Sequence, residues 1–153
     1  MPIVSVKNKM RSSRGQDLKS HMNMQTTHNC MPVSRAENKL AGAAQAFSYD
    51  FRGKTVLDIG SSTGGFTEYA LLRGAKKVIA VEKGTRQMKA PLRFDSRIDL
   101  REKTDIFSVT RDSLSKNQGE IKIDTILADV SFISLKQVLI HAKAQLASSQ
   151  TDF

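Results

Sequence analysis

The stretch from Thr55 to Glu82, which reads TVLDIGSSTGGFTEYALLRGAKKVIAVE, constrains the fold more than any other part of this chain. It contains an apolar run at 55–59, a glycine-rich turn, a segment with helical periodicity and a second apolar run at 77–81. A strand, a helix and a second strand in this order form a unit with parallel strands, and the turn lies at their carboxyl ends. Ligands bind at that edge in Rossmann-like sheets. We therefore expect an α/β fold with a cofactor site in this stretch.

Shorter segments on both sides continue the alternation of helices and strands. A helix is expected from about 35 to 48, because Ser34 and Glu37 fit a capping box and apolar residues recur along one face, namely Ala36, Leu40, Ala43, Ala44 and Phe47. After Glu82 we expect a short helix at 86–90, a strand at 98–101, a helix at 108–116, a strand at 121–128 and a helix at 135–146. This alternation indicates a mainly parallel sheet.

The chain is basic, with a formal net charge of +9 over 153 residues. Such a charge favours a polyanionic partner such as RNA, or an anionic membrane surface. Residues 1–31 are basic, lack sustained periodicity and are expected to be disordered, so the folded domain is expected at 32–153. Two interpretations fit the basic segment, an RNA-contacting arm and a non-native extension.

Neither a membrane segment nor a metal site is expected from the composition. No apolar run approaches the ~20 residues that span a bilayer, and the N-terminus does not resemble a secretory signal. Cys30 is the single cysteine, and together with His28 it falls short of a zinc ligand set. We therefore expect a cytoplasmic chain with a free thiol, no metal and no stable membrane association.

The turn Asp58–Gly65 (DIGSSTGG) has the features of a cofactor loop. Glycine at a strand end lets a ligand approach the backbone, and the following helix start presents free N–H groups. A dinucleotide site favours G-x-G-x-x-G, whereas this chain has G-x-x-x-G-G, which disfavours NAD. Glu82 ends the second apolar run, where an acid accepts hydrogen bonds from the ribose hydroxyls of NAD or S-adenosylmethionine alike.

Three further polar residues are candidates for the same site. Asp129 follows the apolar run at 121–128 and is expected to point into the crevice, although an Asp here can also cap the next helix. Asp105 follows the strand at 98–101 and fits either an adenine contact or an ordinary loop acid. Lys39 lies beside the apolar stripe of the first helix, a position that by itself indicates a solvated lysine.

Four segments in order resemble the FtsJ-type family of S-adenosylmethionine-dependent RNA ribose 2′-O-methyltransferases. Within it they are most similar to the TlyA branch, whose members are often labelled hemolysin A. The segments lie within about residues 33–146 and are Ser34–Leu40 (SRAENKL), Asp58–Phe66 (DIGSSTGGF), Arg73–Val78 (RGAKKV) with Glu82, and Ala128–Leu135 (ADVSFISL). The resemblance implies a Rossmann-like class I methyltransferase fold, with S-adenosylmethionine as cofactor and RNA, above all ribosomal RNA, as substrate.

The resemblance also implies roles for individual residues. Lys39 would be a catalytic lysine near the ribose 2′-oxygen, and Asp129 would hold and orient lysine amines. Glu82 would bind the cofactor ribose and Asp105 its adenine. Arg35 and Lys39 are the expected RNA contacts. The other expected cofactor contacts lie in the glycine loop and are Asp58, Gly60, Ser61, Ser62, Gly64, Gly65 and Phe66.

The chain also departs from the family pattern. Its first lysine segment reads SRAE where TlyA members usually have SRGG, and residues 1–31 do not resemble the S4-type RNA-binding domain that normally comes first. The family's second catalytic lysine, in a K-P-Q-F-E segment after the fifth strand, would lie beyond Phe153. About four of seven strands are then expected, in the order 3-2-1-4. The strand that ends at Asp129 becomes a sheet edge, so we expect marginal stability or self-association through that edge.

Two alternative hypotheses stand beside this one. The first is a catalytically inactive chain that binds cofactor or RNA, and it is motivated by the second lysine segment, which is not found before Phe153. The second is a membrane-active hemolysin. Only the family label suggests it, and the clearest expected helix, which is short and alanine-rich, argues against it.

Overall fold

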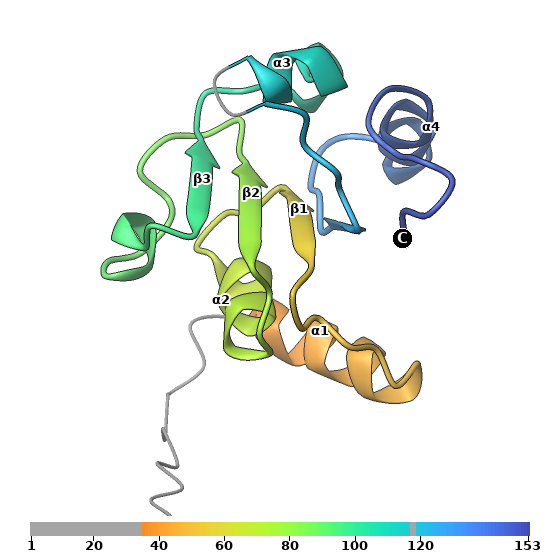
Figure 1. The fold of residues 1–153 in the computed structure, drawn as a ribbon. Helices are drawn as coiled ribbons and strands as arrows, with labels where there is room; N and C mark the ends of the chain where they lie inside the picture. Colours follow the sequence, from red (N-terminus) through yellow and green to blue (C-terminus); the bar gives the residue numbers. More distant parts are fainter. Residues whose placement is uncertain (1–34, 117–118) are drawn as a thin grey trace, which may run out of the picture. The chain divides into compact units, whose positions relative to one another are not determined.

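Four short parallel strands form the sheet of the computed structural model, which describes residues 35–116 and 119–153. The strands are β1 (Thr55–Ile59), β2 (Lys77–Val81), β3 (Ile98–Arg101) and β4 (Thr125–Ala128), in the order β3-β2-β1-β4 (Figure 1). The α/β class and this strand order confirm the sequence-based expectation. The expected basic arm at 1–31 and the cap residue Ser34 lie outside the described residues.

Helices cover both faces of the sheet, which explains why its central strands are apolar without alternation. On one face, Val56 and Val78 pack with residues of α1 (Arg35–Ala46) and α2 (Gly65–Leu72), which lie side by side. On the other face, Leu57 and Ile79 pack with residues of α3 (Arg111–Ser115) and α4 (Leu135–Gln145). Strands β1 and β2 are buried from their second residue onward, so ligands can reach them only at their ends.

The expected helix at 86–90 is absent, and a 3-10 helix, η1 (Leu92–Phe94), follows it instead. The segment is held by contacts with the glycine loop. Met88 is buried, and the Lys89 backbone N–H donates to the Thr63 carbonyl over 3.4 Å. Those tertiary contacts replace the local hydrogen bonds that a helix would need.

Three other elements are shorter than their sequence patterns indicated. Helix α3 begins at Arg111 because Thr110 caps it, its hydroxyl accepting from the Ser113 backbone N–H at 3.2 Å. The preceding residues form the 3-10 helix η2 (Ile106–Ser108). Strand β4 begins at Thr125, not at Ile121. In α1 only Leu40 and Ala44 are buried, while Ala43 is exposed and Phe47 is 81% exposed, so the apolar stripe is narrower than expected.

Strand β4 is an edge strand, as expected, but the chain returns to its first residues. The Ile126 backbone N–H donates to the Asp152 carbonyl at 2.8 Å, and the Asp152 backbone N–H donates to the Asp124 carbonyl at 3.0 Å. The Asp152 carboxylate also accepts from Tyr49 Oη at 2.8 Å and from Lys54 Nζ at 3.1 Å. The edge is therefore covered at the start of β4.

Candidate active site

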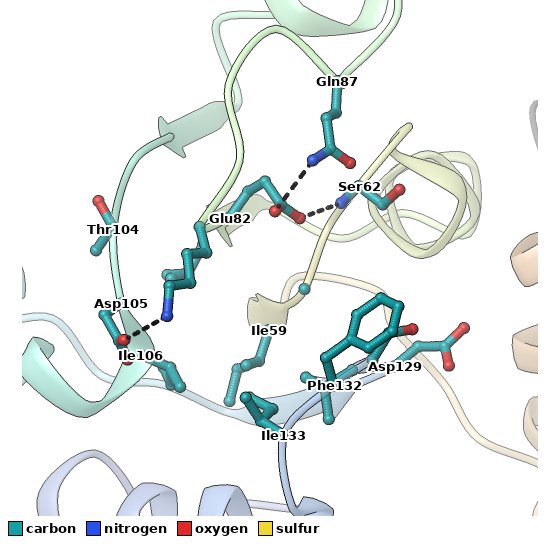
Figure 2. A pocket seen from close by; sticks show the side chains of 15 residues that line it. Ile59, Ser62, Glu82, Gln87, Thr104, Asp105, Ile106, Asp129, Phe132 and Ile133 are labelled. Atoms are coloured by element: carbon teal, nitrogen blue, oxygen red, sulfur yellow. Dashed lines mark hydrogen bonds and ion pairs between the residues drawn. The ribbon is translucent and has the colours of Figure 1, made fainter.

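A cavity of about 570 Å³ opens at the carboxyl ends of the strands. Its walls come from the ends of β1 and β2, the loop after β3 and the segment after β4 (Figure 2). Five of the residues expected from the sequence line it, namely Gly60, Ser62, Glu82, Asp105 and Asp129. The remaining cofactor-loop residues, Asp58, Ser61, Gly64, Gly65 and Phe66, are not among the lining residues, and Phe66 packs against the core beside α1 and α2.

Two glycines allow the loop after β1 to pack closely against its neighbours. Gly60 has φ +80°, and a Cβ there would lie 2.8 Å from the Asp129 carbonyl oxygen. Gly64 has φ +98° at the N-cap of α2, and a Cβ there would collide with the Leu92 side chain. Glycine is therefore required at both positions, for the backbone conformation and for the space.

The Glu82 carboxylate is a hydrogen-bond acceptor for two loops. Its Oε2 accepts from the Ser62 backbone N–H at 2.9 Å, and its Oε1 accepts from the Gly84 backbone N–H at 2.7 Å. Gln87 Nε2 lies 3.4 Å from Oε1 (Figure 2). These bonds fix the carboxylate on the cavity wall, where Oε2 can accept a further hydrogen bond.

Asp58 lies behind the glycine loop and is 1% exposed. Its Oδ2 accepts from Thr67 Oγ1 at 2.6 Å. Its Oδ1 and the buried Ser61 Oγ find no hydrogen-bond partner among residues 35–116 and 119–153. Burial raises the pKa of Asp58 to about 6, the hydrogen bonds from Thr67 act in the opposite direction, and the carboxylates of Asp129 and Glu82 add to the rise.

Lys39 and Asp129 are 90 residues apart in sequence and form an ion pair. Lys39 Nζ lies 3.0 Å from Asp129 Oδ2 and 3.3 Å from Oδ1. The Lys39 side chain is 65% exposed and that of Asp129 is 37% exposed, so the pair faces solvent at the mouth of the cavity. Periodicity alone indicated a solvated lysine, whereas the structure brings it to the acid that follows β4. Arg35 is exposed one turn before Lys39, at the start of α1.

Asp105 is a loop acid that faces the cavity, and its contact with adenine stays a prediction. It caps η2, because its Oδ1 accepts from the Phe107 backbone N–H at 3.0 Å, and it lines the cavity. Its Oδ2 forms an ion pair with Lys83 Nζ at 3.2 Å. The backbone hydrogen bond of Phe107, with that of the Lys83 side chain, holds the pKa of Asp105 below its usual value.

Sequence reasoning missed several lining residues, above all Phe132 and Lys83. Phe132 is fully exposed at 106% and has a left-handed backbone with φ +64°. A bulky residue in that conformation is strained, and such strain is common at functional sites. Its position three residues after Asp129 in the segment DVSFISL is the signal that could have identified it.

The chain is similar to several known proteins. Residues 32–153 match the family model described as FtsJ-like methyltransferase. The chain is 42% identical over 107 residues to the 16S/23S rRNA (cytidine-2′-O)-methyltransferase TlyA of Mycobacterium tuberculosis, covering 70% of this chain and 38% of the relative. It is 35% identical over 128 residues to hemolysin A of Brachyspira hyodysenteriae, covering 83% of this chain and 51% of the relative.

A solved structure is also similar to this chain. The structure of a candidate hemolysin from Streptococcus thermophilus has a TM-score of 0.72 and 32% identity, covering 82% of this chain and 44% of that chain. The chain thus spans about half the length, or less, of the curated relatives that it matches.

Proposed function

Because the chain belongs to the FtsJ-like methyltransferase family, we propose that it serves S-adenosylmethionine-dependent methyl transfer to a ribose 2′-hydroxyl of RNA, with ribosomal RNA as the substrate. The observation that carries this proposal is the ion pair between Lys39 Nζ and Asp129 Oδ2, at 3.0 Å, beside the cavity. The relative from Mycobacterium tuberculosis, named as an rRNA (cytidine-2′-O)-methyltransferase, supports the acceptor.

The residues present fit S-adenosylmethionine. A cavity of about 570 Å³ is within the usual size range of small-molecule sites. Glu82 offers carboxylate oxygens to ribose hydroxyls, and Gly60 leaves its loop without a side chain that would block the approach. The carboxyl groups of Asp58, Glu82 and Asp129 suit a ligand that carries positive charge. When bound, this cofactor supplies a methyl group that is already activated for transfer.

Lys39 and Asp129 are suited to act on the acceptor hydroxyl. A ribose hydroxyl has a high pKa, so it becomes a nucleophile only if its proton is removed as it attacks. In its neutral form the Lys39 amine can accept that proton, and in its ammonium form it can stabilise the developing alkoxide. Two contacts, at 3.0 and 3.3 Å, hold Lys39 Nζ against the Asp129 carboxylate, which reduces the orientations that the amine must sample.

Transfer of labelled methyl groups from S-adenosylmethionine to ribosomal RNA tests the proposal. Lys39→Ala is expected to lower transfer by about 10²- to 10⁴-fold, the usual contribution of a positioned proton-transfer group, while S-adenosylhomocysteine binding is unchanged. Lys76→Ala is the matched control, because Lys76 is an exposed lysine just before β2, at the opposite end of the strands. Equal transfer by Lys39→Ala and by the unmodified chain would show that Lys39 has no catalytic role.

The runner-up is a chain that binds cofactor or RNA without turnover. Binding of S-adenosylhomocysteine without any methyl transfer would favour it, and turnover by the 153-residue chain would eliminate it.

The minor alternative, a membrane-active hemolysin, is supported by the names of relatives alone. Within residues 35–116 and 119–153, the structure contains no helix with the length and apolarity needed to cross a membrane. Release of a dye from lipid vesicles tests this alternative directly.

A further inference from the structure

Arg86 and Lys103 are exposed cations on two adjoining loops at the carboxyl edge of the sheet. Arg86 lies in the loop after β2, and Lys103 lies in the loop after β3. The Lys103 backbone N–H donates to the Gly84 carbonyl at 3.0 Å, which joins the two loops two residues before Arg86. Neither side chain forms an ion pair with any of residues 35–116 or 119–153. The proposed reaction gives them no role.

The acidic side chains of the same two loops already have partners. Glu102 accepts from Arg93 Nη2 at 3.2 Å, and Asp105 accepts from Lys83 Nζ at 3.2 Å. The Glu82 carboxylate accepts from backbone N–H groups. The two exposed cations therefore keep their charge and their hydrogen-bond donors for a partner outside the chain, and an anionic group is the partner that fits them.

A strained backbone places both cations. Arg86 has φ +54° and Lys103 has φ +53°, in the left-handed region that long side chains rarely adopt. Ser62 and Phe132, which line the cavity, share this conformation. Such strain is common at functional sites. Solvation alone would not require either cation to be held in this way.

The two loops lie at the other end of the carboxyl edge from the ion pair of Lys39 and Asp129. Asp129 follows β4 and Lys103 follows β3, which are the two outer strands of the order β3-β2-β1-β4. Three strand spacings of ~4.8 Å separate those strands, which is about 14 Å. A nucleotide whose ribose lies beside Lys39 does not itself reach this far, whereas phosphates further along the same RNA strand can.

The surroundings of the two cations favour RNA over an anionic membrane. Their neighbours Thr85, Gln87 and Thr104 are polar. Membrane-surface anchors insert bulky apolar side chains beside their basic residues, and neither 83–87 nor 102–105 contains one that is exposed. Single-stranded RNA is instead held by cations that contact its phosphates.

We propose that Arg86 and Lys103 bind phosphate groups of the RNA backbone outside the target nucleotide. This inference rests on the proposed function, because RNA is the substrate proposed there. The Arg86 guanidinium can donate two hydrogen bonds to one phosphate, and the Lys103 ammonium acts beside it as a point charge. Contacts with phosphate carry no information about the base, so the two residues position the RNA without selecting its sequence.

RNA binding by the 153-residue chain, measured by fluorescence anisotropy over a series of salt concentrations, tests the inference. The probes are a labelled fragment of ribosomal RNA and labelled poly(U). The double variant Arg86→Ala/Lys103→Ala is expected to bind both probes more weakly by one common factor, about three- to thirtyfold. The slope of log Kd against log salt concentration should become shallower by about 1.4, because each contact with a single strand accounts for about 0.7.

Arg73→Ala/Lys76→Ala is the matched control, because it also removes one exposed arginine and one exposed lysine. Both lie between α2 and β2, at the opposite end of the strands. Residues 1–31 are basic but are the same in every variant, so their contribution cancels. Neither Arg86 nor Lys103 lines the cavity, so binding of S-adenosylhomocysteine should be equal in all variants and shows that each is folded.

The outcomes separate this inference from the proposed function. If the two double variants bind RNA equally, the inference is wrong and the proposed function is unaffected. A loss confined to the ribosomal fragment would mean that the residues read bases, which also overturns it. If the unmodified chain binds neither RNA, the proposed substrate fails and the inference fails with it. Binding to phosphatidylglycerol vesicles that requires Arg86 and Lys103, in the absence of RNA binding, would identify a membrane as the partner instead.

Discussion

Replacing Asp58 with asparagine should change how the stability of the fold depends on pH. Asp58 is 1% exposed, and burial raises its pKa from 3.8 to about 6. The folded chain therefore holds this proton more tightly than the unfolded chain does. The resulting stabilisation is fully present below pH 3.8 and is lost as the pH rises through about 6. Asparagine cannot ionise, so the Asp58→Asn variant does not lose stability at this position as the pH rises.

The size of the effect follows from the two pKa values. Their difference is about 2 units, and each unit corresponds to 1.36 kcal/mol, so the effect is about 3 kcal/mol. Asparagine can still accept the hydrogen bond that Thr67 Oγ1 donates at 2.6 Å. Its amide would occupy the place of Asp58 Oδ1, which has no partner among the described residues. The cost of that exchange is the same at every pH, so it shifts the stability curve without changing its slope.

Urea unfolding followed by far-UV circular dichroism, at several pH values from 2 to 8, measures this effect in both proteins. The free energy of unfolding of Asp58→Asn minus that of the unmodified chain should increase by about 3 kcal/mol as the pH rises. Asp95→Asn is a control of opposite sign, because hydrogen bonds from Arg97 lower the pKa of Asp95. That variant should lose stability relative to the unmodified chain as the pH rises through the acid range. A difference between Asp58→Asn and the unmodified chain that is constant with pH would refute the reasoning.

Two further predictions concern the packing around the site and the sheet edge. Gly64→Ala places a Cβ against the Leu92 side chain, whereas Gly119→Ala, also at positive φ, meets nothing within 4 Å. Thermal unfolding should show that Gly64→Ala is less stable than Gly119→Ala by about 1–3 kcal/mol. Equal melting midpoints of the two variants would contradict the predicted clash. Deleting residues 148–153 removes the backbone bridge from Asp152 to β4 and uncovers that edge. Size-exclusion chromatography should then show increased self-association, whereas a monomer with a sharp thermal transition would count against it.

The strands near the site could be predicted because the signals that define them are local. Strands β1, β2 and β3 have the bounds expected from the sequence, since β1 and β2 are short, mostly apolar runs and β3 (IDLR) alternates apolar with charged residues. Strand β4 starts later than its apolar run, because its partner β1 begins only at Thr55, opposite Asp124, whose carboxylate accepts from the Thr55 backbone N–H at 2.9 Å. Residues 121–123 therefore have no residue of β1 opposite them to pair with in register.

The remaining differences come from contacts between distant residues. Met88 is buried against the glycine loop, and nothing in the local pattern of 86–90 indicates that contact. Periodicity placed Lys39 on a solvated face, and only the family resemblance suggested its role near Asp129. Lys83 was missed for the same reason, because its partner Asp105 is 22 residues away on another strand end.

The Glu82 carboxylate accepts hydrogen bonds from the backbone N–H groups of Ser62 and Gly84. These bonds limit how residue 82 can change in evolution. A substitution at this position alters the support of two loops and the ligand-binding wall at once. Selection for a folded chain and selection for ligand affinity therefore act on the same side chain. We expect Glu82 to resist drift even in a descendant that has lost catalysis, whereas Lys39, at the exposed mouth of the cavity, would be free to vary in such a descendant.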